Sequence, residues 1–172
     1  MRAMLMTKVV SLLETDAPLE SADVPQPQPG GGQVLIKIAA CGVCHTELDE
    51  IEGRTAPPKL PVIPGHEVIG RVVECGAGVT KLAVGDRVGV GWIFSSTGTR
   101  DENLSPEFRG TGRDVDGGYA EYMIVGEDYA VPIPETFADA EAAPLLCAGA
   151  VGYLALRLTG IENGQPLGLT GF

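Results

Sequence analysis

Glycine and proline interrupt this chain at short intervals, and this spacing constrains its fold more than any other feature. The 172 residues include 24 glycines and 13 prolines. Proline lacks a backbone donor and glycine weakens the interior of helices and strands, so both residues concentrate in turns. The spacing therefore predicts many short strands joined by turns rather than a helical bundle.

Five runs between these turns have the composition of strands. They cover residues 34–41, 68–75, 87–92, 119–125 and 129–132. Their rhythm indicates a small, strongly bent antiparallel barrel, so the expected fold class is mainly β. One short helical turn is expected at residues 46–52, and the alanine- and leucine-rich segment 142–158 predicts one longer apolar helix. The tail, residues 166–172, is typical of a buried parallel strand that runs into a glycine turn.

Charge and hydropathy exclude several classes of partner. A net charge of -11 disfavours nucleic acid and anionic membranes, because both require a positive surface. Residues 1–8 lack the apolar core of a signal peptide, and no stretch approaches the roughly 18 apolar residues of a membrane span. We therefore expect a cytoplasmic protein with no nucleic-acid or membrane partner. Its four cysteines are expected to be free thiols or metal ligands rather than a disulfide framework.

Two cysteines and a histidine stand in settings that suit a metal. These are Cys44 after Cys41-Gly-Val, His66 before Glu67, and Cys147 in an apolar segment. Two thiolates and an imidazole match zinc, and three protein ligands leave a fourth position open, as in catalytic zinc sites. Glu67 is a candidate for a supporting group or an alternating ligand. The spacing alone also allows half of a zinc ribbon, a redox pair or two core thiols.

Several motifs together resemble the zinc-containing alcohol dehydrogenase family, and they occur in that family's order. They are Cys41-Gly-Val-Cys44-His45-Thr46-Glu47, Gly65-His-Glu-Val-Ile-Gly70 with Gly76-Ala-Gly-Val79, Val84-Gly-Asp-Arg-Val88, Asp116-Gly-Gly-Tyr-Ala-Glu-Tyr122 and Leu145-Leu-Cys-Ala-Gly149. The resemblance covers essentially the whole chain. It implies a GroES-like catalytic domain: a bent antiparallel barrel with a few short helices and one longer C-terminal helix.

The resemblance also implies a role for each residue of these motifs. The catalytic zinc ligands are Cys44, His66 and Cys147, and Glu67 is the acidic neighbour that can reach the metal. Thr46 matches the hydroxyl residue that accepts the proton of the substrate alcohol. His45 matches the residue that contacts the cofactor pyrophosphate. In such enzymes zinc acts as a Lewis acid that lowers the pKa of the alcohol, so that an alkoxide gives up hydride.

Other residues near these motifs have simpler interpretations. Cys41 and Cys75 are expected to be buried thiols that pack in strands. His45 is equally consistent with a solvated residue beside the site. Trp92 is expected in the core, although its family position also fits a pocket wall.

Three departures from the family pattern change the expected chemistry. Residues 95–106 lack the four cysteines that hold a structural zinc in relatives, so we expect one catalytic zinc and no structural zinc. Asp49 stands where many relatives place a proton-relay histidine; its carboxylate is a candidate to relay a proton or to support a ligand. The dinucleotide fingerprint Gly-x-Gly-x-x-Gly only begins at the end of the chain. We therefore interpret residues 1–172 as one GroES-like catalytic domain, with 165–172 the stub of a missing nucleotide-binding domain.

Two functional interpretations follow. The first is the catalytic zinc domain of an alcohol dehydrogenase acting on a small alcohol or carbonyl. This chain would not bind NAD(P) by itself, the cofactor of full-length relatives, and would be a poor dehydrogenase alone. The second is a non-catalytic GroES-like binding or structural module, or a designed minimal zinc protein with residual Lewis-acid activity. The uncovered apolar face of the helix at 142–158 also predicts a homo-oligomer.

Overall fold

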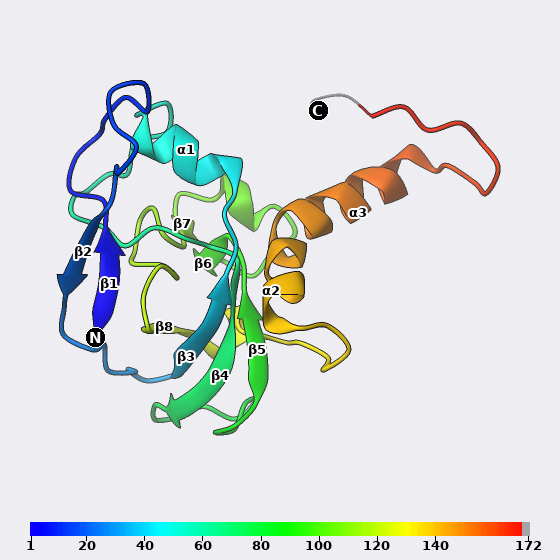
Figure 1. Cartoon of the computed structure of the whole chain (residues 1–172). Coiled ribbons are helices and arrows are strands. Elements are labelled where there is room, and N and C mark those ends of the chain that lie inside the picture. Colours follow the sequence, from blue (N-terminus) through cyan, green and yellow to red (C-terminus); the bar gives the residue numbers. More distant parts are fainter. Residues whose placement is uncertain (170–172) are drawn as a thin grey trace.

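The computed structural model describes residues 1–169, and short antiparallel strands form its body (Figure 1). The strands are β1 (Arg2–Leu5), β2 (Glu20–Asp23), β3 (Gln33–Cys41), β4 (Val68–Cys75), β5 (Arg87–Val90), β6 (Ile93–Ser95), β7 (Arg109–Gly110), β8 (Tyr122–Gly126) and β9 (Val131–Pro132). The helices are α1 (His45–Ile51), α2 (Asp139–Ala142) and α3 (Ala148–Thr159), with short 3-10 helices η1 (Glu102–Leu104), η2 (Glu127–Tyr129) and η3 (Ala143–Leu146).

The main sheet contains five strands in the order β8-β3-β4-β5-β9, and all of its pairings are antiparallel. β1 pairs with β2 and β6 pairs with β7, again antiparallel. The register between β3 and β4 shifts at two places, between Leu35 and Ile36 and between Ile38 and Ala40. Such irregularities increase local twist and bend a sheet. The expectation of a mainly β, antiparallel fold is confirmed.

The main core lies against one face of this sheet and consists largely of valine. In β3, Val34 and Ile36 are fully buried on one face because successive side chains of a strand point to opposite sides. They pack in one cluster with the other buried residues Val68, Val72, Val88, Val90, Met123, Val125 and Ala130. A smaller cluster of Met6, Ile51 and Val62 fixes α1 to the first hairpin.

The strands agree with the sequence expectations in the centre of the sheet and differ at its margins. β4 covers residues 68–75 as expected, and β3 begins one residue earlier than expected. Residues 91–92 do not continue β5, and the strand expected from residue 119 begins at Tyr122. Of the strand expected at 129–132, only Val131–Pro132 is present, because Glu127–Tyr129 forms a 3-10 turn.

The expectation of one continuous helix over residues 142–158 was wrong. α2, η3 and α3 follow one another, and Cys147 separates η3 from α3 with φ −128° and ψ −80°, outside the helical region. Pro144 lies in η3 and lacks the backbone donor that a continuous helix would use there. α3 ends at Gly160, which adopts the left-handed conformation that glycine tolerates best. Figure 1 shows α3 projecting away from the strands.

The tail expected to form a buried strand is different in the part that the structure describes. Residues 165–169 have no regular secondary structure, and Leu167 and Leu169 are exposed. No strand within residues 1–169 lies beside them to supply hydrogen bonds. The rest of that expected segment, residues 170–172, lies outside the described residues.

None of the described helices is by itself long and apolar enough to cross a membrane. The consecutive helical segments Asp139–Leu146 and Ala148–Thr159, bent by 51° at their junction, meet the length and composition criteria only when taken together.

Candidate metal centre

A tight loop that leads into β4 positions His66 at the site. Gly65 has φ +97°, and a Cβ atom there would lie 2.7 Å from the ring of Tyr119 and 2.9 Å from the sulfur of Cys41. Only glycine therefore fits at this position. The imidazole of His66 is 1% exposed, and the ring of Trp92 covers it edge-on with the centroids 5.0 Å apart.

A single carboxylate, that of Glu47, fixes two of the predicted ligands. Cys44 immediately precedes α1, and its backbone N–H donates a hydrogen bond to Oε2 of Glu47 at 2.7 Å. The other oxygen, Oε1, lies 2.5 Å from Nδ1 of His66. Both side chains are buried, so water does not compete for this contact. A carboxylate on Nδ1 keeps the proton on that nitrogen and leaves Nε2 free to coordinate a metal.

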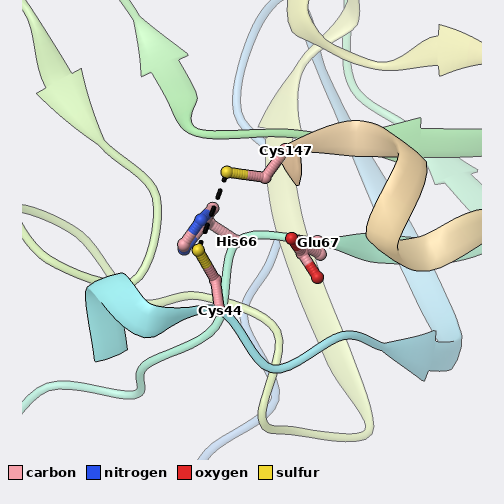
Figure 2. A group of neighbouring side chains, drawn as sticks. All are labelled: Cys44, His66, Glu67 and Cys147. Atoms are coloured by element: carbon pink, nitrogen blue, oxygen red, sulfur yellow. Dashed lines mark hydrogen bonds between the residues drawn. The ribbon is translucent and has the colours of Figure 1, made fainter. Parts of the chain in front are cut away.

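The three predicted ligands and Glu67 come together although they are distant in sequence. One donor atom each from Cys44, His66, Glu67 and Cys147 lies within 4.8 Å of the others. Figure 2 shows the two sulfurs facing each other beside the imidazole, with Glu67 next to them. Cys44 comes from the start of α1, and Cys147 from the junction before α3.

The donor set fits zinc on two observations. The sulfurs of Cys44 and Cys147 lie 3.8 Å apart. Two zinc–sulfur bonds of about 2.3 Å that meet at the tetrahedral angle also separate their sulfurs by about 3.8 Å. In addition, Nε2 of His66 is buried and has no hydrogen-bond partner among the described residues. Buried polar atoms rarely lack partners, and a coordinated cation is one explanation for such an atom.

The electrostatics of the group favour one thiolate over two. Burial acts to raise the pKa of Cys44, but hydrogen bonds with Thr46 and Cys147 and the charge of His66 hold it below its ordinary value. Burial and then the charge of Cys44 raise the pKa of Cys147 to about 12. Burial would lower the pKa of His66, yet its contact with Glu47 raises it. A bound divalent cation supplies the positive charge that deprotonates a coordinating thiol.

The other predicted site residues lie along α1. Oγ1 of Thr46 is 3.5 Å from the sulfur of Cys44, so this hydroxyl borders the donor group. The side chain of His45 is 76% exposed. Asp49 is partly exposed, and its Oδ1 accepts a hydrogen bond from Nε of Arg54 at 2.5 Å and lies 3.6 Å from Nε2 of His45. Thr46 thus lies at the donor group, whereas Asp49 is engaged by a guanidinium on the outer side of the helix.

The remaining cysteines are separate from the donor group. The sulfur of Cys41 lies close to the backbones of Gly65 and Gly118, and burial raises its pKa to about 12. Cys75 packs against the main core, and its thiol donates to the carbonyl of Leu82 at 3.8 Å. Both cysteines pack against the main core as expected, but they are half-buried rather than fully buried.

Two glutamates that the motifs did not single out belong to this region. Glu47 and Glu50 are 2% and 1% exposed, one turn apart on the inner face of α1. Glu47 follows Cys44 at the spacing of a capping box, a signal that predicts its contact with the backbone but not its contact with His66. Glu50 carries no comparable signal, and burial followed by the charge of Glu47 raises its pKa to about 8.

The fold is antiparallel and GroES-like, and it brings two cysteines, a histidine and a glutamate together in one group. These two features define the class of protein. The alcohol dehydrogenase GroES-like domain model matches residues 30–135. The chain belongs to this family.

Similar proteins agree with this assignment. The chain is 45% identical over 161 residues to an alcohol dehydrogenase of Geobacillus stearothermophilus, covering 90% of this chain and 48% of that protein. It is 43% identical over 169 residues to an alcohol dehydrogenase of Rhizobium meliloti, covering 94% and 49%. The chain therefore spans about half the length of the curated relatives it matches.

Solved structures show the same relation. A NAD-dependent alcohol dehydrogenase matches with a TM-score of 0.85 at 27% identity, over 95% of this chain and 49% of that one. A cinnamyl alcohol dehydrogenase of Sorghum bicolor matches with a TM-score of 0.78 at 32% identity, over 92% and 48%.

Proposed function

We propose that this chain is the zinc-binding catalytic domain of an alcohol dehydrogenase, which interconverts a small alcohol and its aldehyde or ketone. One observation carries the proposal: the donor atoms of Cys44, His66, Glu67 and Cys147 lie within 4.8 Å of one another in a chain of this family. Two cysteines and the histidine would hold one zinc ion, and Glu67 would be a neighbouring or alternating ligand. The fourth position would take the oxygen of the substrate.

The other residues of the site would have separate roles. A zinc ion bound here would supply Lewis-acid activation of an alcohol or carbonyl oxygen. Oε1 of Glu47 lies 2.5 Å from Nδ1 of His66, so Glu47 would keep the proton of the imidazole on that nitrogen and orient the ring. Thr46 would accept the alcohol proton at Oγ1, and Asp49 would release it to solvent from the outer side of α1. His45, exposed beside them, would contact the pyrophosphate of a dinucleotide.

The described sheets differ from those that bind dinucleotides. Dinucleotides bind to parallel sheets with a glycine-rich turn at a helix N-terminus. All pairings between named strands in residues 1–169 are antiparallel. We therefore expect no tight NAD(P) binding by this chain alone, and titration calorimetry that finds stoichiometric, tight NADH binding would refute this expectation.

Elemental analysis tests the metal. Protein purified without added metal should contain close to one zinc per chain, and C44S and H66A should lose most of it. C75S is the matched control, because Cys75 lies in the core away from the donor group. A chain free of metal after purification, and unable to take up zinc in dialysis, would contradict the proposal and favour a non-catalytic GroES-like module.

We also propose that the chain self-associates through α3. Val151, Tyr153, Leu154 and Leu158 are all more than half exposed on this helix. Contiguous exposed apolar surface of this kind usually marks an interface. Light scattering should detect a dimer or larger species; a strict monomer at high protein concentration would refute self-association.

A further inference from the structure

A cavity of about 450 Å³ lies between the first hairpin and the main sheet. Its walls come from β1, from the residue that follows β2, from β8, and from the segments 59–63 and 115–117. The four donor residues of the metal centre are not among its lining residues. Figure 1 places the β1–β2 hairpin on the side of the molecule opposite α3. A ligand in this cavity would therefore contact neither the donor group nor the exposed face of α3.

The walls of the cavity suit an apolar molecule. Most of the side chains that line it are aliphatic or aromatic, among them Leu5, Val24, Ile63, Phe94, Met123 and Ile124. Ile63 and Met123 are each 3% exposed, so this part of the wall belongs to the packed interior and is fixed in place. Sites for small molecules are typically cavities of about 300–1,000 Å³ with largely apolar walls and a few polar groups.

Two of the polar groups at the cavity already have partners in the protein. Oδ1 of Asp116 accepts a hydrogen bond from the backbone N–H of Ile63 at 3.1 Å. The backbone nitrogen of Met1 donates to the carbonyl of Val24 at 2.8 Å. These groups hold the wall together, and a ligand is not needed to satisfy them.

The other two polar side chains of the cavity have no such partner within residues 1–169. The ammonium of Lys59 forms no ion pair or hydrogen bond there, and the hydroxyl of Tyr122 forms no hydrogen bond. An ammonium only donates, and a tyrosine hydroxyl can donate as well. A ligand that satisfies both groups must bring acceptor oxygens and a negative charge.

We propose that this cavity binds an apolar monocarboxylate, with its carboxylate on Lys59 and Tyr122 and its hydrocarbon part against the aliphatic and aromatic walls. A carboxylate accepts several hydrogen bonds through two oxygens, and hydrogen bonds between charged groups are stronger than neutral ones. The chain carries a net charge of -11, which repels anions of higher charge such as phosphate esters. One negative charge is what the single lysine of the cavity can balance.

Titration calorimetry on the chelator-treated full chain tests the proposal with butyrate, hexanoate and octanoate. Affinity should rise about fourfold for each methylene that enters the cavity. Octanoate should bind more tightly than octanamide, which has the same chain and no charge. K59Q should weaken octanoate binding about fivefold, as expected for an ion pair open to solvent. K81Q is the matched control, because Lys81 pairs with Asp128 outside the cavity, and its affinity should be unchanged.

Two further variants locate the ligand. V24W places an indole in the cavity and should abolish binding, with the urea midpoint showing that the chain still folds. Y122F keeps the wall and loses only the hydroxyl, so it should bind about fivefold more weakly. The proposal is overturned if octanoate does not bind, if octanamide binds equally well, or if the parent chain, K59Q and Y122F share one affinity.

The inference does not rest on the proposed function, and the same titrations in zinc-loaded protein keep the two apart. A carboxylate can also coordinate zinc, so octanoate that binds only to the loaded protein would lie on the metal; the cavity proposal would then fail and the zinc site would stand. If the chain takes up no zinc and binds octanoate with the dependence on Lys59 described above, the proposed function fails and the cavity site stands.

Discussion

Glu47 should control metal affinity although it is not a ligand. Its two oxygens hold different partners: Oε2 accepts from the backbone of Cys44 at 2.7 Å, and Oε1 lies 2.5 Å from Nδ1 of His66. Replacing it therefore loosens two donors at once. Both Glu47 and His66 are buried, so no water is positioned to replace a lost acceptor.

The substitutions E47A and E47Q should weaken zinc binding to different extents. Loss of such a partner typically weakens metal binding about 10- to 100-fold, or about 1.4 to 2.7 kcal/mol. E47A removes both contacts, so we expect a loss near the upper value. In E47Q the amide has one carbonyl oxygen for two donors, so it keeps one contact, and we expect a loss of about tenfold.

Competition with a chromogenic zinc chelator measures this directly as an apparent Kd. E52Q is the matched control, because Glu52 caps the other end of the same helix and its carboxylate pairs with Arg54. Its affinity should stay within about twofold, as is usual for surface substitutions. If E47A binds zinc as tightly as the parent chain while C44S does not bind it, the argument about Glu47 is wrong.

Three further predictions concern stability. R87A removes a buried guanidinium that donates to Asp139 and to the carbonyl of Phe137, both at 2.9 Å; because Asp139 is itself half-exposed, urea unfolding should show a loss of about 1–3 kcal/mol. Y129F loses the hydroxyl that donates to Glu102 at 3.0 Å; we expect about 1 kcal/mol in the same assay and faster proteolysis within residues 96–105. Burial raises the pKa of Glu50 from 4.5 to about 8. The folded state thus keeps a proton that the unfolded state loses, so stability should fall as pH rises from 4.5 to 8 in chelator-treated protein, and less so in E50Q.

The centre of the fold was predictable because local and tertiary preferences agree there. β4 carries valine and isoleucine between glycine-bearing turns, and its expected limits are those in the structure. β2 could not be predicted in the same way: Glu20-Ser-Ala-Asp23 has no β-branched residue, and it is a strand only because it pairs with β1. Tertiary pairing overrides propensity in such short segments.

The candidate site likewise contains residues that the sequence predicts and residues that it does not. Cys44 and His66 each lie in a short sequence motif that marks them as candidate ligands. The position of Cys147 in the sequence does not predict that it lies beside them, so its assignment depended on the family resemblance. Glu50 was missed because every residue of α1 up to it, apart from Leu48, is polar or charged, which is typical of a solvated helix. Glu50 is buried by tertiary packing against the inner face of α1, and the local sequence of α1 does not predict that packing.

If the chain binds zinc and associates through α3 as proposed, the break at Cys147 would couple the two events. The carbonyl of Cys147 accepts the hydrogen bond that starts this helix, from Val151 at 2.9 Å, so helix and donor sulfur share one residue. We expect a partner that tilts α3 as it packs against the exposed leucines to shift that sulfur as well. By thermodynamic linkage, the ion and the partner then change each other's affinity by the same factor. The zinc site would thus report, through its own occupancy, whether the outer face of α3 is covered.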